Sequence, residues 1–156
     1  DGASFLFTGT AYMNEAGDIS SYALRPPETV CFRDLLAQNP ITCSSVLIRK
    51  DLLKDDAAAH DGLHEDYAMW LSVLKGEQRA YAVSQPLTLH RMAAGSKSSN
   101  KMQAARMNYK TLRHVGVSRL VALIKMMQYA TRNFRKYSAI YKGFIQEGND
   151  SCRLYT

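Results

Sequence analysis

The clearest hydrophobic pattern in the chain lies between residues 65 and 75. Apolar side chains recur there at spacings of three and four residues, at Tyr67, Trp70, Leu71 and Leu74. This spacing places them on one face of an α-helix. We therefore predict a helix over 65–75 with that face in the core, Glu65 and Asp66 in its first turn, and Gly76 as its C-terminal cap.

Other segments have the alternation and β-rich composition of strands. They are residues 3–12, 19–24, 41–48, 79–83 and 87–91. Turn residues at 14–18 predict a hairpin between the first two, and Pro86 separates the last two. The segment 41–48 ends in apolar residues and is predicted to be a buried strand.

Further helices are predicted at 29–38, at 51–56 with Asp51 as a cap, at 100–115 and at 118–141. In the third, one face carries Met102, Ala105, Tyr109 and Leu112. In the fourth, the apolar stripe is Leu120, Leu123, Ile124, Met127 and Phe134, with Lys125, Arg132 and Lys136 on the other side. Residues from Gly148 onward are expected to fray. The fold class is α/β: a mixed β-sheet of about four strands flanked by helices, with a C-terminal helical pair.

Composition limits the classes of partner. At 156 residues the chain suits one core, and its formal charge of +6 suits anionic partners such as nucleotide phosphates, nucleic acid or an anionic membrane surface. Three cysteines without Cys-x-x-Cys spacing favour a reducing cytoplasm. No apolar run approaches the roughly 18 residues of a membrane span. The first residues contain no charged-then-apolar leader, and the chain is expected to be a piece of a longer protein.

The candidate chemistry lies at the start of the 65–75 helix. The helix dipole favours negative charge there, so Glu65 and Asp66 are expected to be ionised, and a fixed carboxylate can act as a general base. The alternative is that they only complement the dipole. The loop 93–101, rich in hydroxyls and cations, is either a phosphate contact or an ordinary solvated loop. The four His residues lack metal-ligand spacing, and no phosphate-binding or zinc-protease motif occurs.

Two stretches carry a resemblance to a known family. They are His64-Glu65-Asp66-Tyr67 with Trp70-Leu71, and the run from Leu89 to Lys101, behind the segment from Thr42 to Ile48. Together they resemble the C-terminal part of bacterial family-2 glycosyltransferases of the GT-A fold, over about residues 4–137. The resemblance implies an inverting, hexosyltransferase-like enzyme that moves a sugar from a nucleotide-sugar donor to an acceptor hydroxyl in cell-surface polysaccharide synthesis.

The resemblance also implies roles for individual residues. Asp66 matches the base that deprotonates the acceptor hydroxyl, and Glu65 is the neighbour that orients acceptor or base. Arg91 matches a contact to the donor diphosphate. The loop with Ser96, Lys97 and Ser98 would close over the donor phosphates.

The chain departs from the family pattern in two respects. It has no Asp-x-Asp motif, which in the family holds a divalent metal, Mg²⁺ or Mn²⁺, in an N-terminal nucleotide-binding half. We therefore expect no metal site in this chain, which would be inactive alone. His90 stands where the family often has Tyr, and is a less favoured candidate ligand. The expected division is 1–116, a partial GT-A domain on the acceptor side, and 117–156, an amphipathic helix and tail.

The expected partners are the nucleotide-sugar donor, a glycan or lipid-linked acceptor and the missing half, without nucleic acid. Homo-oligomerisation is one open possibility, because an isolated half-domain would expose a sheet edge or apolar surface. The protein is expected to be cytoplasmic, and peripheral binding to the inner face of the plasma membrane is a second open possibility. A basic amphipathic helix more often simply has a solvated face. One alternative is a basic module that binds nucleic acid or anionic lipid without catalysis. Another is a structural domain with the carboxylates in a salt bridge and no adjoining cleft.

Overall fold

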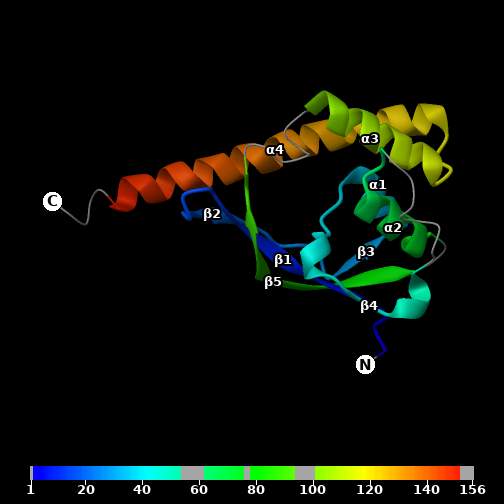
Figure 1. The fold of residues 1–156 in the computed structure, drawn as a ribbon, viewed down its shortest axis with the longest axis horizontal. Helices are drawn as coiled ribbons and strands as arrows, with labels where there is room; N and C mark the ends of the chain where they lie inside the picture. Colours follow the sequence, from blue (N-terminus) through cyan, green and yellow to red (C-terminus); the bar gives the residue numbers. More distant parts are fainter. Residues whose placement is uncertain (1, 54–61, 76–77, 94–100, 152–156) are drawn as a thin grey trace.

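The computed structural model describes residues 2–53, 62–75, 78–93 and 101–151. A twisted mixed sheet forms one side of the molecule, and the helices lie together on the other side (Figure 1). The α/β fold class and the C-terminal helical pair are confirmed. Three predictions fall outside the described residues: the loop carrying Ser96, Lys97 and Ser98, the cap at Gly76, and the part of the 51–56 helix beyond Leu53.

Two parallel strands form the centre of the sheet. β1 (Phe5–Met13) runs beside β5 (Arg79–Arg91), from Leu6 opposite Tyr81 to Met13 opposite Arg91. β2 (Ile19–Leu24) pairs antiparallel with β1, and β3 (Thr29–Cys31) antiparallel with β5, giving the order β2-β1-β5-β3. β4 (Leu47–Ile48) also pairs with β1. The predicted β1–β2 hairpin is confirmed.

The two strands predicted on either side of Pro86 are one strand. β5 continues through this proline, and the pairing register with β1 shifts on both sides of Gly9, the partner of Pro86. Proline has no N–H to give to a ladder and fits at such an irregularity. Phe5 and Phe7 are buried before Gly9, and Thr10 and Tyr12 after it, so the inward alternation of β1 changes by one residue there.

The helix predicted over 65–75 is confirmed as α2 (Glu65–Leu74). All four residues of its predicted apolar face are buried. The Trp70 ring packs on Phe5 of β1 with the ring centres 5.2 Å apart. This contact fixes α2 against the inner face of the sheet.

Two other segments differ from the prediction. The segment 29–38 begins as β3 and becomes helical only at α1 (Phe32–Ala37). The buried strand predicted at 41–48 is wrong: Cys43–Ser45 forms a 3₁₀ turn, only Leu47–Ile48 pairs, and Leu47 is 72% exposed. A second 3₁₀ turn follows at Lys50–Leu52, and Asp51 lies inside it, paired with Arg49, rather than capping it.

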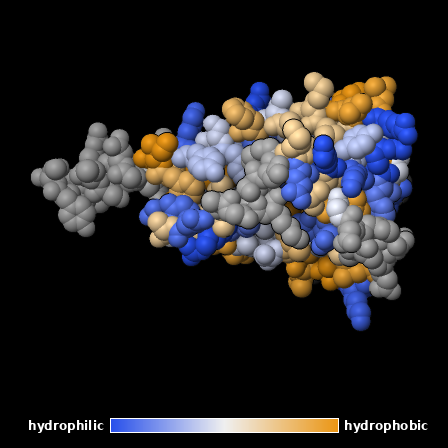
Figure 2. Space-filling model, turned by 45° about the horizontal axis from the view of Figure 1, so that its top comes forward, coloured by the Kyte–Doolittle hydropathy of each residue, from blue (hydrophilic) through white to orange (hydrophobic). Residues whose placement is uncertain are grey.

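The two C-terminal helices bury different faces from those that their hydrophobic patterns predict. In α3 (Lys101–His114), Leu112 is buried as predicted but Met102 is largely exposed, and Asn108 and Thr111 are buried instead. In α4 (Arg119–Ser151), the predicted apolar stripe faces outward, and the helix extends past the predicted end at 141 to Ser151, into the segment expected to fray. Figure 2 turns this side of the molecule forward and shows hydrophobic side chains between hydrophilic ones. Among the described helices none is long and apolar enough to cross a membrane.

Candidate functional site

The start of α2 is built by a short turn. Gly62 has a φ of +83°, a backbone conformation that glycine adopts without steric cost. Leu63 is buried behind it, and His64 is the N-cap residue from which the helix begins. Glu65 and Asp66 therefore lie in the first turn, as predicted, where the helix dipole favours their charge.

His64 holds this turn against α3. Its backbone N–H donates to Thr111 Oγ1 at 3.1 Å, and its Nε2 lies 3.3 Å from the carbonyl oxygen of Ala104. Thr111 is fully buried, so the first bond is shielded from water. Apart from the position of His64 directly before the helix, no sequence pattern indicates this role.

A second tether holds the body of α2. The Tyr67 hydroxyl donates to the carbonyl oxygen of Leu35 in α1 at 2.8 Å, and both residues are buried. Burial raises the pKa of Tyr67, so it stays a neutral donor at physiological pH. The two carboxylates are thus carried on a helix that is fixed to both α1 and α3.

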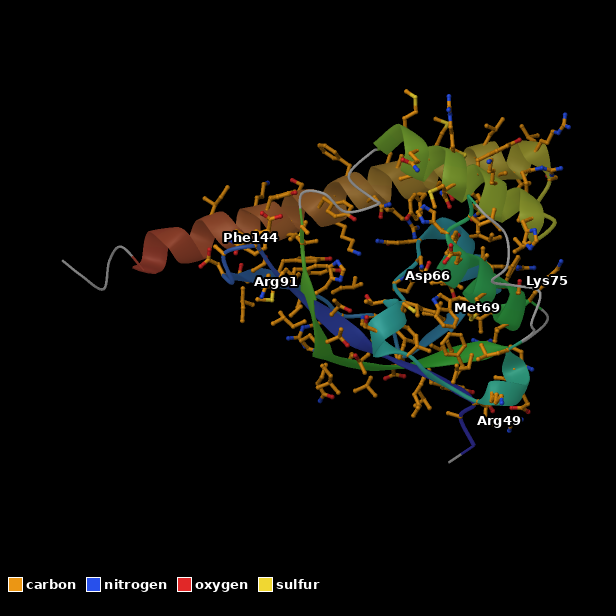
Figure 3. The ribbon with its side chains drawn as sticks, in the orientation of Figure 1. Arg49, Asp66, Met69, Lys75, Arg91 and Phe144 are labelled. Carbon is orange, nitrogen blue, oxygen red and sulfur yellow. The ribbon has the colours of Figure 1, made fainter. Side chains whose placement is uncertain are left out.

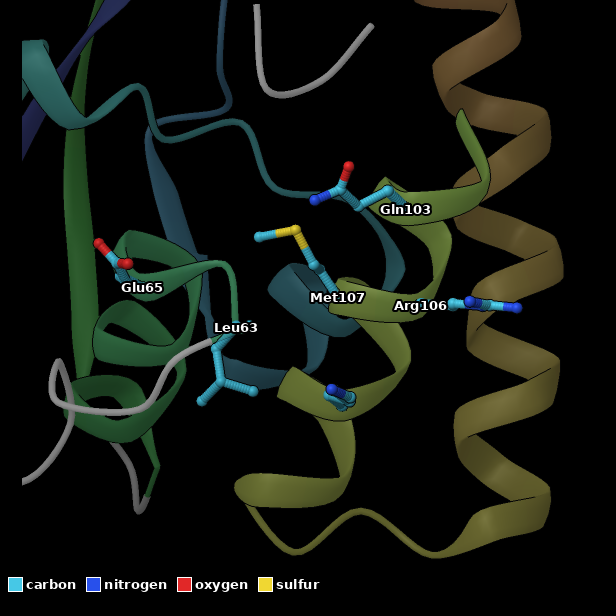
Figure 4. A pocket seen from close by; sticks show the side chains of 7 residues that line it. Leu63, Glu65, Gln103, Arg106 and Met107 are labelled. Atoms are coloured by element: carbon cyan, nitrogen blue, oxygen red, sulfur yellow. The ribbon is translucent and has the colours of Figure 1, made fainter. Parts of the chain in front are cut away.

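A pocket of about 380 Å³ opens beside the first turn of α2. It is lined by Gly62, Leu63, Glu65, Gln103, Arg106, Met107 and Lys110. Gln103 and Met107 point from α3 toward α2, whereas the Glu65 carboxyl group points away from α3 (Figure 4). The Lys110 ammonium lies close to the turn, since a Cβ on Gly62 would come within 3.4 Å of its Nζ. Figure 4 also shows the Arg106 side chain pointing away from α2, so the groups that face this pocket are the Gln103 amide, the Met107 side chain and the Lys110 ammonium, a set that can bind a polar or anionic ligand.

Asp66 faces a different neighbour. It is half-buried, and its Oδ1 accepts a hydrogen bond from the Tyr67 N–H at 2.8 Å. The pKa of the Cys43 thiol is raised, first by burial and then by the charge of Asp66, which places this carboxylate near the Cys43–Ser45 turn. Sequence reasoning did not connect these two segments.

Within the described residues, no ion pair engages either carboxylate of the pair. Among the described residues Arg49 and Asp51 form an ion pair, but no ion pair involves Glu65 or Asp66. The alternative of a purely structural domain predicts that these carboxylates form a salt bridge and have no adjoining cleft. The described residues show instead two acids without an ion pair, one of which lines a pocket.

Arg91 is not brought to the carboxylates. Its Nη1 donates to the carbonyl oxygens of Asn14 and Glu15, at 3.3 and 3.1 Å, in the turn between β1 and β2. Figure 3 shows it beside this hairpin, apart from Asp66 at the start of α2. Its assignment to the donor diphosphate, with that of Ser96, Lys97 and Ser98, stays a prediction.

His90 lies in an aromatic and cationic cluster. Its ring meets the Tyr12 ring edge-on at 6.0 Å, and the Lys136 ammonium lies 5.3 Å from the centre of the same Tyr12 ring. Burial, and then the charge of Lys136, lower the pKa of His90, and burial lowers the pKa of Lys136. A neighbouring ammonium disfavours a divalent cation at His90. No group of three or more His, Cys, Asp or Glu residues suited to a metal occurs in the part of the chain that the structure describes.

The structure thus places Glu65 and Asp66 in the first turn of a buried helix that packs on the inner face of a mixed sheet. Comparison with known proteins confirms that the chain is related to bacterial glycosyltransferases over most of its length.

One relative is a Bacillus subtilis protein described as a teichuronic acid biosynthesis glycosyltransferase, TuaG. It is 30% identical over 112 residues, which are 72% of this chain and 44% of TuaG. Another is the Escherichia coli UDP-Glc:α-D-GlcNAc-diphosphoundecaprenol β-1,3-glucosyltransferase WfaP, 24% identical over 137 residues, which are 88% of this chain and 54% of WfaP. The chain thus spans about half the length of these relatives. No family model matches it, and no solved structure does.

Proposed function

We propose that the chain is the acceptor-side half of an inverting, family-2 glycosyltransferase of the GT-A fold. The enzyme would transfer a hexose from a nucleotide-sugar donor to an acceptor hydroxyl during cell-surface polysaccharide synthesis. The observation that carries the proposal is the pair of carboxylates, outside any described ion pair, on a doubly tethered helix. The reaction is faster when the base that accepts the proton of the acceptor hydroxyl is already held in position before the substrate binds.

In this proposal Asp66 is the catalytic base. It accepts the proton of the acceptor hydroxyl while that oxygen forms a bond to the anomeric carbon of the donor sugar. The bond from this carbon to the diphosphate oxygen breaks, and the nucleoside diphosphate leaves with the bonding electron pair. Glu65, the neighbour of Asp66 in the first turn of α2, orients the acceptor or the base. Attack opposite the leaving group inverts the anomeric carbon.

The departing diphosphate needs positive charge. Arg91 and the loop with Ser96, Lys97 and Ser98 are proposed to supply it, because cations and hydroxyl donors stabilise developing charge on phosphate oxygens. The hydrogen bonds of Arg91 to the hairpin carbonyls hold its guanidinium in place at the end of β5. The Arg91 side chain is exposed, and a guanidinium has five N–H groups in all.

The nucleotide and the metal are assigned to a half that lies outside this chain. The described residues do not offer a ligand set for Mg²⁺ or Mn²⁺, so we place no step of the reaction on a metal here. The outer face of the sheet supports a missing half, because it is open and apolar. Its exposed side chains include Leu47, Tyr81, Val83, Leu87 and Leu89, between 37% and 72% exposed. A sheet with parallel central strands normally has helices on both faces.

For the acceptor we propose a glycan or lipid-linked sugar, at a cytoplasmic site. The names of the two relatives support this, since that of TuaG refers to teichuronic acid biosynthesis and that of WfaP to a diphosphoundecaprenol acceptor. The acceptor hydroxyl is proposed to bind beside Asp66, on the side of α2 that faces the Cys43–Ser45 turn. The pocket between α2 and α3, which Asp66 does not line, is proposed to hold the rest of the glycan through Gln103 and Lys110.

The alternative, a basic module for nucleic acid or anionic lipid without catalysis, predicts no turnover at all. The experiment is to incubate the intact protein that carries this chain with UDP- and GDP-sugars, Mn²⁺ and lipid-linked or free glycan acceptors. Release of the nucleoside diphosphate, dependent on acceptor, supports the transferase. Binding of donor without turnover on any acceptor, together with tight binding of nucleic acid, supports the alternative.

A further inference from the structure

The outward face of α4 is apolar along most of its length. Seven large side chains, which we call the α4 stripe, are between 49% and 78% exposed: Leu120, Leu123, Ile124, Met127, Phe134, Tyr141 and Ile145. Their spacing keeps them on one side of the helix. At ~1.5 Å per residue the stripe extends about 38 Å.

The opposite face of α4 is already occupied, so the stripe cannot turn inward. Ser20 of β2 donates from its Oγ to the carbonyl oxygen of Ile140 at 2.8 Å, and Ile140 and Ala122 are fully buried. A Cβ on Gly143 would overlap the Ser20 side chain and approach the Tyr22 backbone N within 2.9 Å. This close approach of β2 to α4 fixes the rotation of the helix.

The charged residues of α4 alongside the stripe, from Arg119 to Lys142, are all cationic, and its two acids, Glu147 and Asp150, follow beyond Ile145. Thirteen of the twenty Lys and Arg residues of the chain, and none of its fourteen Asp and Glu residues, lie between Gln78 and Gln146. Arg132, Arg135 and Lys142 are exposed on α4 itself. A surface of this kind attracts an anionic partner and repels a second copy of itself.

We propose that the α4 stripe lies flat on an anionic lipid surface, with its apolar side chains inserted among the acyl chains and its cations at the headgroups. An exposed apolar stripe beside cations on a helix not apolar enough to span a bilayer is the arrangement of an interfacial helix. The missing half has its own open surface on the outer face of the sheet, on the side of the molecule away from α4 (Figure 1). Two copies joined through the stripe would bring like charges together, which disfavours a dimer at this face.

This inference goes beyond the proposed transferase and rests on it at one point, the place given to the missing half; membrane binding and turnover are measured separately. If the protein binds vesicles but shows no turnover, only the transferase proposal is refuted. If turnover of a soluble acceptor occurs without vesicle binding, the membrane proposal fails alone.

The test is sedimentation of the intact protein with vesicles of phosphatidylcholine alone or with about 30% phosphatidylglycerol, at about 0.1 M salt where surface charge is still felt. We expect binding to the anionic vesicles and much less to the neutral ones. The double variant M127E/F134E should bind at least about tenfold more weakly, because it removes two inserting side chains and adds two negative charges. The variant R132Q/R135Q/K142Q should lose about a hundredfold, from roughly 1 kcal/mol for each cation near the surface.

The matched control is M102E/A105E, which introduces the same charges at exposed positions of α3 and should retain most of the binding. Circular dichroism checks that each variant is folded, and all substituted positions are exposed. Equal loss in the control and in M127E/F134E would overturn the proposal, because overall charge rather than the stripe would then drive binding. So would a failure of the wild type to bind, or stripe-dependent dimers in sedimentation velocity without vesicle binding.

Discussion

Replacing Tyr67 with Phe isolates the hydrogen bond that fixes α2 to α1. The hydroxyl donates to the Leu35 carbonyl oxygen at 2.8 Å, and the two residues are 4% and 0% exposed. Phe keeps the ring and its packing, so the substitution removes the bond and leaves a buried carbonyl without this donor.

The structure sets the expected magnitude. A buried neutral hydrogen bond contributes about 1 kcal/mol net, and an unsatisfied carbonyl raises the cost of its loss toward about 2 kcal/mol. For a denaturant slope of about 2 kcal/mol per M, the urea midpoint should fall by about 0.5–1 M. The assay is urea unfolding of the chain followed by the fluorescence of Trp70, its single tryptophan, which is buried on the same helix.

Tyr141→Phe is the matched control, because it removes the same hydroxyl from a side chain that is 58% exposed. It should change the free energy of unfolding by less than about 0.5 kcal/mol. If Tyr67→Phe and Tyr141→Phe have the same small effect, then apolar packing alone holds α2, and the tether has no part in positioning the carboxylates.

Two further predictions concern the buried tyrosines Tyr12 and Tyr67 and the glycine Gly9 in β1. Burial raises the pKa of both Tyr12 and Tyr67, so the unfolded chain releases their protons near pH ~10 while the folded protein keeps them. Stability should be full below that pH and fall above it, with a slope approaching about 1.4 kcal/mol per pH unit for each tyrosine; urea midpoints that stay constant from pH 9 to 11 would contradict this. Gly9→Ala should prevent normal folding, since its Cβ would lie 2.8 Å from the backbone oxygens of Leu24 and Ser84. A soluble Gly9→Ala protein with an unchanged thermal midpoint would show that the sheet at this irregularity is not as close-packed as described.

The parts of the fold that the sequence predicts are those where one local pattern decides the structure. The face of α2 follows from residues three and four apart, and the β1–β2 hairpin from a turn between two short strands. The prediction of two strands around Pro86 was wrong because proline commonly ends a strand. Here the pairing between β1 and β5 continues past Pro86 through the register shifts at its partner Gly9. The segment 41–48 has strand composition, but only its last two described residues find a partner on β1.

The orientation of α4 could not be predicted from its hydrophobic pattern. Periodicity shows that a helix has an apolar face, but not whether the rest of the chain covers it. The contact with β2 uses Gly143, Ser20 and a backbone carbonyl, and a hydropathy pattern gives no weight to such close backbone approach. The carboxylates of the site were predictable because they share one helix turn. Their pocket was not, because Gln103, Arg106 and Lys110 come from α3, about forty positions further along the chain.

The central claim is that Asp66 is the base of a sugar transfer. The most direct measurement compares acceptor-dependent turnover of the intact protein with that of Asp66→Asn and of Asp51→Asn. Asp51 is an exposed acid paired with Arg49 and serves as the control. We expect Asp66→Asn to lose about 10²–10⁴-fold in turnover with donor binding retained, because the amide cannot accept the proton, while Asp51→Asn remains active. Turnover by Asp66→Asn equal to that of Asp51→Asn would show that the acids at the start of α2 only complement the helix dipole.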